Sequence, residues 1–86
     1  MKVLFHGSVQ ELTNGKTSYG AGEARDVRGL IGELGDRFGA AFREFLLGER
    51  TCLILVNGKG LMMTGGYGTP LDSGDTVDIL PFVTEG

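Results

Sequence analysis

Few side chains in this sequence have the types and spacing that catalysis or metal binding requires. His6 is the only histidine and has no serine or cysteine pattern around it, so neither a nucleophile pair nor a metal cluster can be drawn. Cys52 is the only cysteine and precedes the apolar run "LILV", which predicts a buried small side chain, with a reactive or persulfide-accepting thiol as the alternative. Asp72 and Asp75, in "DSGD", are typical of a turn. The sequence therefore predicts no catalytic residue and no metal ligand.

Apolar residues near the C-terminus could serve as a contact surface for another protein. Leu80 and Phe82 alternate with Ile79 and are expected to point away from the face that Ile79 shares with the core. The segment 60–70 could cover them, or they could remain exposed and, with Pro81, form a docking patch beside the C-terminal tail. Both interpretations stay open.

The last four residues follow this apolar stretch. They are predicted to form a flexible tail behind a single domain of residues 1–82, and they are Val83, Thr84, Glu85 and Gly86. A frayed chain end without a function is the alternative interpretation.

The composition limits the classes of protein that the chain can belong to. A chain of 86 residues accommodates one domain with a modest core, and it is expected to be a monomer when free. A net charge of −3 argues against nucleic acid as a partner, because phosphate binding needs clustered Lys and Arg. The opening "MKVLF" is too short for a signal peptide or a membrane span, so we expect no membrane association and a cytoplasmic location. A single cysteine is consistent with a reducing compartment.

The first half of the sequence predicts two strands and a helix. "KVLFHGSVQEL" indicates a strand with one buried face, and Asn14-Gly15 after it is a strong signal for a two-residue hairpin leading to a second strand within 17–24. From Val27 to Phe38 the apolar residues recur every three or four positions, which predicts a helix with Asp26 as its N-cap and Gly39 as its end. A shorter helical turn is expected to follow, containing Phe42, Phe45 and Leu46.

The second half predicts the remaining strands. "TCLILVNGKGL" indicates a central strand covered on both faces and ending in a hairpin at Asn57-Gly58. Residues 62–71 are predicted to be a loop, in which Met62 and Met63 fill a gap or serve as adaptable contacts. "TVDILPF" is the last strand. A single central helix and two apolar terminal strands favour an α+β fold in which those strands lie side by side in one mixed sheet, the ubiquitin-like β-grasp roll.

The sequence resembles the MoaD/ThiS family of sulfur-carrier proteins over nearly its whole length. The resemblance rests on "VLFHGSVQEL", "VRGLIGELGDRFG", "LILVNG" and "TPLDSGDTVDILPFV", in this order and at this distance from a C-terminal glycine. It implies that an adenylating enzyme related to ubiquitin-activating enzymes uses ATP on the carboxylate of Gly86, which then becomes a thiocarboxylate that donates sulfur. Four extended residues reach roughly 13 Å, enough to enter the active site of another protein.

The resemblance also implies a pathway and partners. Molybdenum or tungsten cofactor synthesis is the pathway favoured, with a larger molybdopterin synthase subunit as a second partner and with thiamine synthesis and tRNA thiolation as related pathways. The chain itself would bind no cofactor and would be a substrate rather than an enzyme.

The C-terminus departs from the pattern of the family, which ends Gly-Gly, because Glu85 precedes Gly86 here. Two negative charges about 6 Å apart repel by about 3 kcal/mol at an effective dielectric constant of 20. An activating enzyme would therefore need a cation or a wider channel for Glu85, or the chain would be processed. The alternatives are a ubiquitin-like binding module and a protein modifier joined to lysines through Gly86, both without carrier chemistry.

Overall fold

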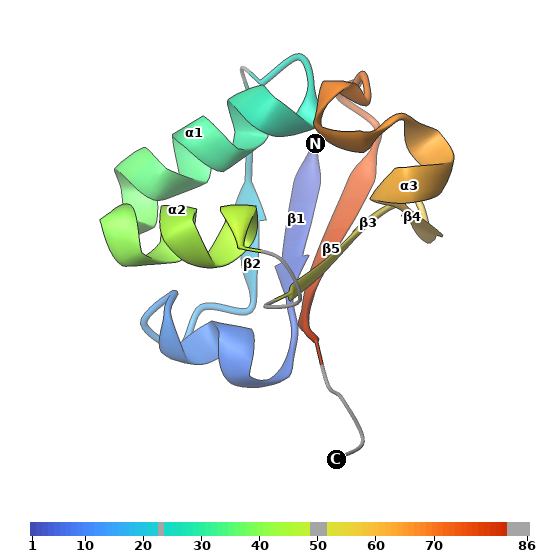
Figure 1. Cartoon of the computed structure of the whole chain (residues 1–86). Coiled ribbons are helices and arrows are strands. Elements are labelled where there is room, and N and C mark those ends of the chain that lie inside the picture. Colours follow the sequence, from blue (N-terminus) through green and yellow to red (C-terminus); the bar gives the residue numbers. More distant parts are fainter. Residues whose placement is uncertain (23, 49–51, 83–86) are drawn as a thin grey trace.

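The computed structural model describes residues 1–22, 24–48 and 52–82, which form a five-stranded sheet with two longer helices on one face (Figure 1). The elements are β1 (Lys2–Phe5), the 3-10 helix η1 (Gly7–Glu11), β2 (Ser18–Gly20), α1 (Val27–Phe38), α2 (Ala40–Leu47), β3 (Cys52–Val56), β4 (Lys59–Gly60), α3 (Leu61–Thr64), the 3-10 helix η2 (Gly66–Gly68) and β5 (Thr76–Pro81).

The sheet is mixed and has the strand order β2-β1-β5-β3-β4. β1 and β5 are parallel, with Val3 opposite Val77 and Phe5 opposite Ile79, and the other neighbouring strands are antiparallel. The predicted α+β class, the β-grasp roll and the pairing of the first and last strands are confirmed.

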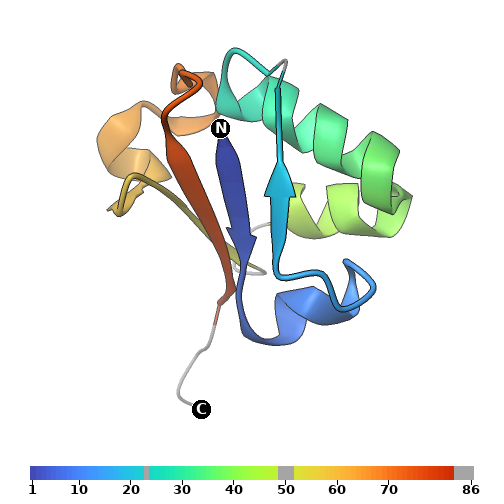
Figure 2. The same ribbon diagram turned by 180° about the vertical axis from the view of Figure 1, so that it is seen from behind.

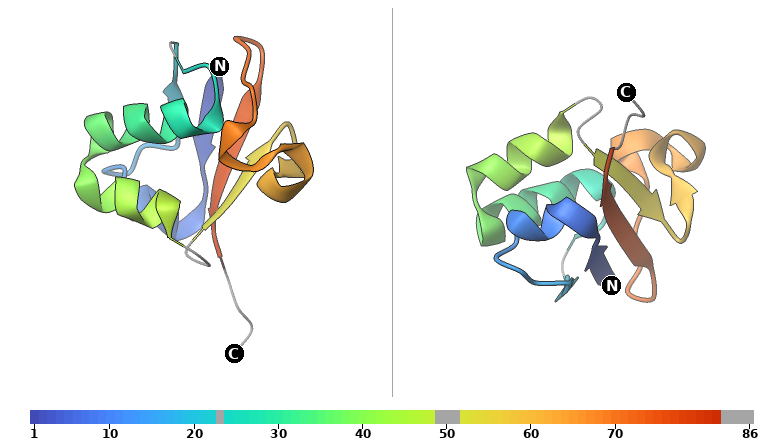
Figure 3. Two further views of the ribbon diagram at one scale, coloured as in Figure 1. Left: turned by 45° about the horizontal axis from the view of Figure 1, so that its top comes forward. Right: turned by 90° about the horizontal axis from the view of Figure 1, so that it is seen from below.

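Helix α1 crosses the inner face of the sheet, as its apolar stripe predicted (Figure 3). Asp26 caps its N-terminus by accepting a hydrogen bond of 2.7 Å from the main-chain N–H of Gly29. Gly39 ends it with a φ of 111°, a conformation that favours glycine. Both predicted helix ends are confirmed. The buried residues of the stripe are Val27, Leu30, Ile31 and Leu34.

Helix α2 follows α1 directly and is longer than the helical turn that the sequence predicted. Its Phe42 and Leu46 are buried in the core under the sheet. Gly35 of α1 allows the two helices to approach, because a Cβ atom there would lie 2.6 Å from Nε of Arg43. Packing against α2 therefore offsets the low helix propensity of this glycine.

The predicted first strand is too long, because β1 ends at Phe5. Gly7, with a φ of 59°, turns the chain out of the sheet into η1, and Val9 remains fully buried from the new position. Asn14 and Gly15 do take the positive φ values of a tight turn, 58° and 80°. They join η1 to β2, however, so the prediction of a two-residue hairpin between strands is wrong, although β1 and β2 do pair antiparallel.

The second predicted hairpin is confirmed. Asn57 and Gly58, with φ values of 52° and 83°, connect β3 to β4. The side chain of Asn57 also ties this turn to β5: its Nδ2 donates to Asp75 Oδ1 at 3.0 Å, and its Oδ1 accepts from the N–H of Thr76 at 3.0 Å. The hydrogen bond from Asn57 holds the pKa of Asp75 below its usual value of 3.8. Asp75 also accepts from the N–H of Asp72 at 2.8 Å, which confirms the predicted "DSGD" turn.

β3 does lie inside the sheet, between β5 and β4, but the prediction that both of its faces are covered is wrong. One face of β3 is open, and Leu53 on it is 44% exposed. An apolar run alone does not distinguish a strand covered on both faces from one whose outer face carries exposed leucines.

The segment predicted as a loop contains two helical turns, α3 and η2. Gly65 and Gly66, with φ values of 122° and 70°, connect them, and the hydroxyl groups of Thr64 and Thr69 hydrogen-bond at 2.9 Å. Met62 is 96% exposed and Met63 80% exposed. They do not fill a gap, so of the two predictions for them only the adaptable contact is left.

Candidate functional site

The end of β5 lies at the opposite end of the sheet from the N-terminus (Figure 1). β5 is paired with β1 on one side and β3 on the other, so its last residue, Pro81, is held by the sheet. The residues predicted as the tail, 83–86, with the predicted sulfur-carrying Gly86, lie outside the described residues. The segment that follows Phe82 therefore starts from a strand inside the sheet.

Part of the predicted docking patch lies on the outer face, which we define as the sheet face turned away from α1 and α2. Leu80 is half-buried there, whereas Ile79 beside it is buried in the core, so the predicted alternation is confirmed. Leu80 pairs in register with the exposed Leu53 of β3. Phe82, just after the strand, is 37% exposed. Leu53, Leu80 and Phe82 thus offer apolar surface beside the start of the tail.

Residues 60–70 do not bury this surface. α3 packs against β3 and β4, and η2 packs against α1, so the segment lies beside the sheet on the side of α1 and α2 (Figure 3). Within the described ranges no helix crosses the outer face, which Figure 2 shows from behind. Pro81 has a different position from its neighbours, because a Cβ atom on Gly7 would lie 3.3 Å from its Cγ. It contacts η1 rather than belonging to the exposed patch.

His6 and Asp78 form an ion pair or hydrogen bond on the outer face. His6 Nε2 lies 2.8 Å from Asp78 Oδ1, and the side chains are 44% and 22% exposed. The register of β5 places Asp78 beside Leu4 of β1 and Leu55 of β3. A polar pair therefore sits among leucines in the centre of the outer face.

The sequence offered neither a nucleophile pair nor a metal cluster around His6, and Asp78 was not foreseen as its partner. The two residues lie 72 positions apart, and only the parallel register of β1 and β5 brings them together. The signal in the sequence was that Asp78 occupies an outward position in an apolar strand, which calls for a partner.

Cys52 is half-buried and faces α2, where its Sγ lies 3.6 Å from the carbonyl oxygen of Phe45. The side chain was predicted to be buried, and it is packed against α2 but only partly buried. Cys52 also lines an apolar groove between β3 and α3, together with Leu53, Met62 and Tyr67. This groove adjoins the exposed part of the outer face through Leu53.

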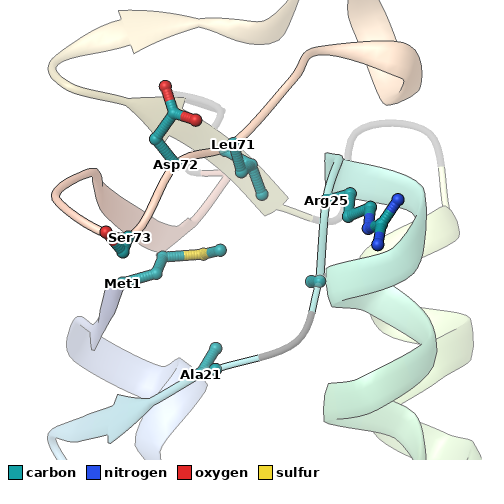
Figure 4. A pocket seen from close by; sticks show the side chains of 8 residues that line it. Met1, Ala21, Arg25, Leu71, Asp72 and Ser73 are labelled. Atoms are coloured by element: carbon teal, nitrogen blue, oxygen red, sulfur yellow. The ribbon is translucent and has the colours of Figure 1, made fainter.

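A second cleft lies at the other end of the sheet, near the N-terminus (Figure 4). The side chain of Met1 extends into it, whereas the charged groups of Arg25 and Asp72 point away from it. The cleft is therefore poorly suited to a charged ligand. It includes Met1, next to the start of β5, and so lies at the other end of that strand from Pro81.

The described residues offer little else that could bind a cofactor or enter a membrane. Across residues 1–22, 24–48 and 52–82, no group of three His, Cys, Asp or Glu side chains could hold a metal ion. None of the helices in those ranges is long and apolar enough to span a membrane. The outer face beside the end of β5 is thus the best candidate for a functional surface.

A β-grasp sheet with its last strand at the centre and an apolar surface beside that strand is the architecture of small ubiquitin-like carrier proteins. Comparison with family models gives a match to the ThiS family over residues 3–86. The chain belongs to the ThiS family and has the ubiquitin-like fold of the ThiS/MoaD sulfur carriers.

Solved structures support this assignment. The chain superposes on a chain of the BexX/CysO complex of Amycolatopsis orientalis with a TM-score of 0.84 and 25% identity, covering 99% of this chain and 98% of that one. The superposition on CysO of Mycobacterium tuberculosis has a TM-score of 0.82 and 25% identity, and it covers 95% of this chain and 98% of CysO. The third similar structure is a complex of subunits 1 and 2 of the molybdopterin-converting factor from Helicobacter pylori 26695. The superposition on one of its chains has a TM-score of 0.66 and 25% identity, and it covers 99% of this chain and 96% of that one. A comparison with curated protein sequences found no match.

Proposed function

We propose that the chain carries sulfur as a thiocarboxylate on Gly86 and delivers it to the synthesis of the molybdenum or tungsten cofactor. The observation that carries this proposal is the ThiS family match, which extends from residue 3 to residue 86 and so includes the C-terminal segment. The pathway is the finer part of the proposal, and the similarity to a chain of the molybdopterin-converting factor complex supports it.

The chemistry occurs in two steps at the terminal carboxylate. A carboxylate oxygen attacks the α-phosphorus of ATP, an acyl adenylate forms, and pyrophosphate leaves. A sulfide sulfur then attacks the activated carbonyl carbon and loses its proton, and AMP leaves with the electron pair of the broken C–O bond, so that Gly86 ends in a thiocarboxylate. ATP is bound by the activating enzyme, and the chain itself binds no cofactor.

The fold contributes a rigid base for a short arm. β5 is paired on both sides, and its last residue, Pro81, still pairs with Cys52 of β3, so the sheet fixes the point from which the arm starts. Four residues after Phe82 can span roughly 13 Å when extended, so Gly86 can react in the active site of a second protein while the domain stays outside. The chain is in this scheme a substrate of other enzymes and has no catalytic role.

The outer face is the surface that these partners would contact. Leu53, Leu80 and Phe82 lie beside the start of the arm, so docking there would place the arm toward the active site of the partner. The partners are an adenylating enzyme and, for cofactor synthesis, a larger synthase subunit. The complexes that contain the similar chains of Amycolatopsis and Helicobacter support partner binding of this kind.

The test is an intact mass measurement after incubation of the full chain with ATP, a sulfide source and candidate adenylating enzymes of the same organism. Exchange of one oxygen for sulfur at Gly86 supports the proposal. No exchange in the wild type, with exchange in Glu85→Gly, would contradict it and indicate a binding module that retains the fold. Higher-mass conjugates to lysines would indicate a protein modifier instead.

A further inference from the structure

The carboxylate of Asp78 has an unusual environment on the outer face. It lies between Leu4 and Leu55 in the register of the sheet, and its Oδ1 accepts a hydrogen bond from His6 Nε2 at 2.8 Å. In the described part of the chain, no other group hydrogen-bonds to this side chain. Because Asp78 is 22% exposed, water can still reach Oδ2 in the free protein.

The pair of His6 and Asp78 presents an acceptor to the outside. A carboxylate can only accept, so Nε2 of His6 carries the hydrogen of the bond between them. Oδ2 of Asp78 is left as an acceptor beside this bond. His6 is 44% exposed, so a group that covers the outer face can reach Oδ2 next to it.

A protein that docks on this face must replace the water at Asp78. A carboxylate that is buried without a new partner is strongly unfavourable, whereas a cationic donor forms a short charge-assisted bond with it. Among cationic side chains, the planar guanidinium group of arginine offers several donors in a fork and is more weakly hydrated than an ammonium group. The net charge of −3 also favours a positively charged partner surface.

We propose that Asp78 is a specificity residue of the outer face, and that the protein which docks there presents an arginine side chain to it within an otherwise apolar contact. The inference rests on the proposed function, because the partner it assumes is the adenylating enzyme that activates Gly86. Surfaces that lack a cationic donor at this point are rejected, because they would bury Oδ2 of the carboxylate without a hydrogen bond.

The experiment is a calorimetric titration of the full chain with the adenylating enzyme that the organism provides, comparing wild type, Asp78→Asn and Asp72→Asn. Asparagine keeps the shape of Asp78 and can still accept from His6, but it turns an NH2 donor toward the arginine. We expect Asp78→Asn to weaken binding at least about tenfold. Asp72→Asn makes the same change of charge at an exposed turn at the other end of β5. The affinity of this variant should stay within about twofold of that of wild type.

Several outcomes would overturn the inference. Equal affinities of wild type and Asp78→Asn would do so. An equal loss of affinity in Asp78→Asn and Asp72→Asn would also do so, because it would indicate only long-range electrostatic attraction. No binding of the wild type would overturn it as well. Asp78→Thr serves as a second variant, because threonine removes the carboxylate and suits a strand, and the same loss of affinity is expected from it.

The proposed function is tested separately by the mass of the same wild-type samples. Binding that depends on Asp78, without the exchange of oxygen for sulfur at Gly86, supports the inference and contradicts the function. Sulfur transfer with unchanged affinity of Asp78→Asn contradicts the inference alone.

Discussion

Replacing Gly32 and Gly35 of α1 with alanine, one at a time, is expected to change stability in opposite directions. Both glycines lie in the interior of the helix and lower its propensity. At Gly32 an added Cβ atom meets no atom within 4 Å, whereas at Gly35 it would lie 2.6 Å from Nε and 2.9 Å from Cβ of Arg43. The two variants therefore share the gain in propensity and differ in packing against α2.

The expected magnitudes follow from these contacts. Gly32→Ala should raise the free energy of unfolding by about 0.5–1 kcal/mol, the difference between glycine and alanine in a helix. Gly35→Ala gains the same amount but forces Arg43 and α2 away, and overpacking of this kind costs about 1–3 kcal/mol. Its net effect should be a loss of up to about 2 kcal/mol.

Thermal and urea denaturation followed by circular dichroism would measure both variants. In a domain of this size a change of 1 kcal/mol in the free energy of unfolding shifts Tm by about 4–8 °C. Gly32→Ala should therefore have a higher Tm than wild type, and Gly35→Ala a lower one. If Gly35→Ala were stabilised as much as Gly32→Ala, the close contact between α1 and α2 would not exist. A loss of stability in Gly32→Ala would show that its face of α1 is covered.

Three further predictions concern the tail, the outer face and pH. Glu85→Gly should increase the rate at which a generic adenylating enzyme of this family activates the chain. The increase should be up to about a hundredfold, because it removes a repulsion of about 3 kcal/mol. Equal or faster activation of wild type in a pyrophosphate exchange assay would contradict the argument. Leu53→Ser should weaken binding to the adenylating enzyme by about 1 kcal/mol or more in calorimetry, whereas Leu47→Ser, at a residue of α2 that is 49% exposed, should not. Tyr19 donates a hydrogen bond of 2.7 Å to Glu33, which raises the pKa of Tyr19 above its ordinary value of 10.0. The stability that this contributes is complete below pH 10.0 and is lost as the pH rises through the raised pKa, so Tyr19→Phe should flatten the alkaline fall in stability, and an unchanged fall would contradict it.

Sequence patterns predicted the elements that have a strong local signal. The stripe between Val27 and Phe38 and the capping residue Asp26 define α1, because both act within a few residues along the chain. The same holds for the turn at Asn57 and Gly58, whose positive φ values suit these residue types.

The errors occurred where the local signal fits two structures. The spacing of Val9 and Leu12 is compatible with a strand followed by a turn, but Gly7 and the burial of Val9 select a 3-10 helix. α3 is too short to show a helical period, and no side chain caps it. The pairing of His6 with Asp78 depends on the register of strands from the two ends of the chain, which no local pattern contains.

A partner that contacts the outer face and receives the tail meets two side-chain carboxylates in succession, Asp78 on β5 and Glu85 next to the reacting Gly86. An extended chain would separate them by about 23 Å, which is well beyond the Debye length of about 8 Å at physiological ionic strength. One cation cannot serve both, so a partner adapted to this chain needs separate positive groups for docking and for the reacting end. Substitutions at the two positions should then act independently, with Asp78→Asn raising KM through weaker docking and Glu85→Gly changing kcat at the carboxylate of Gly86.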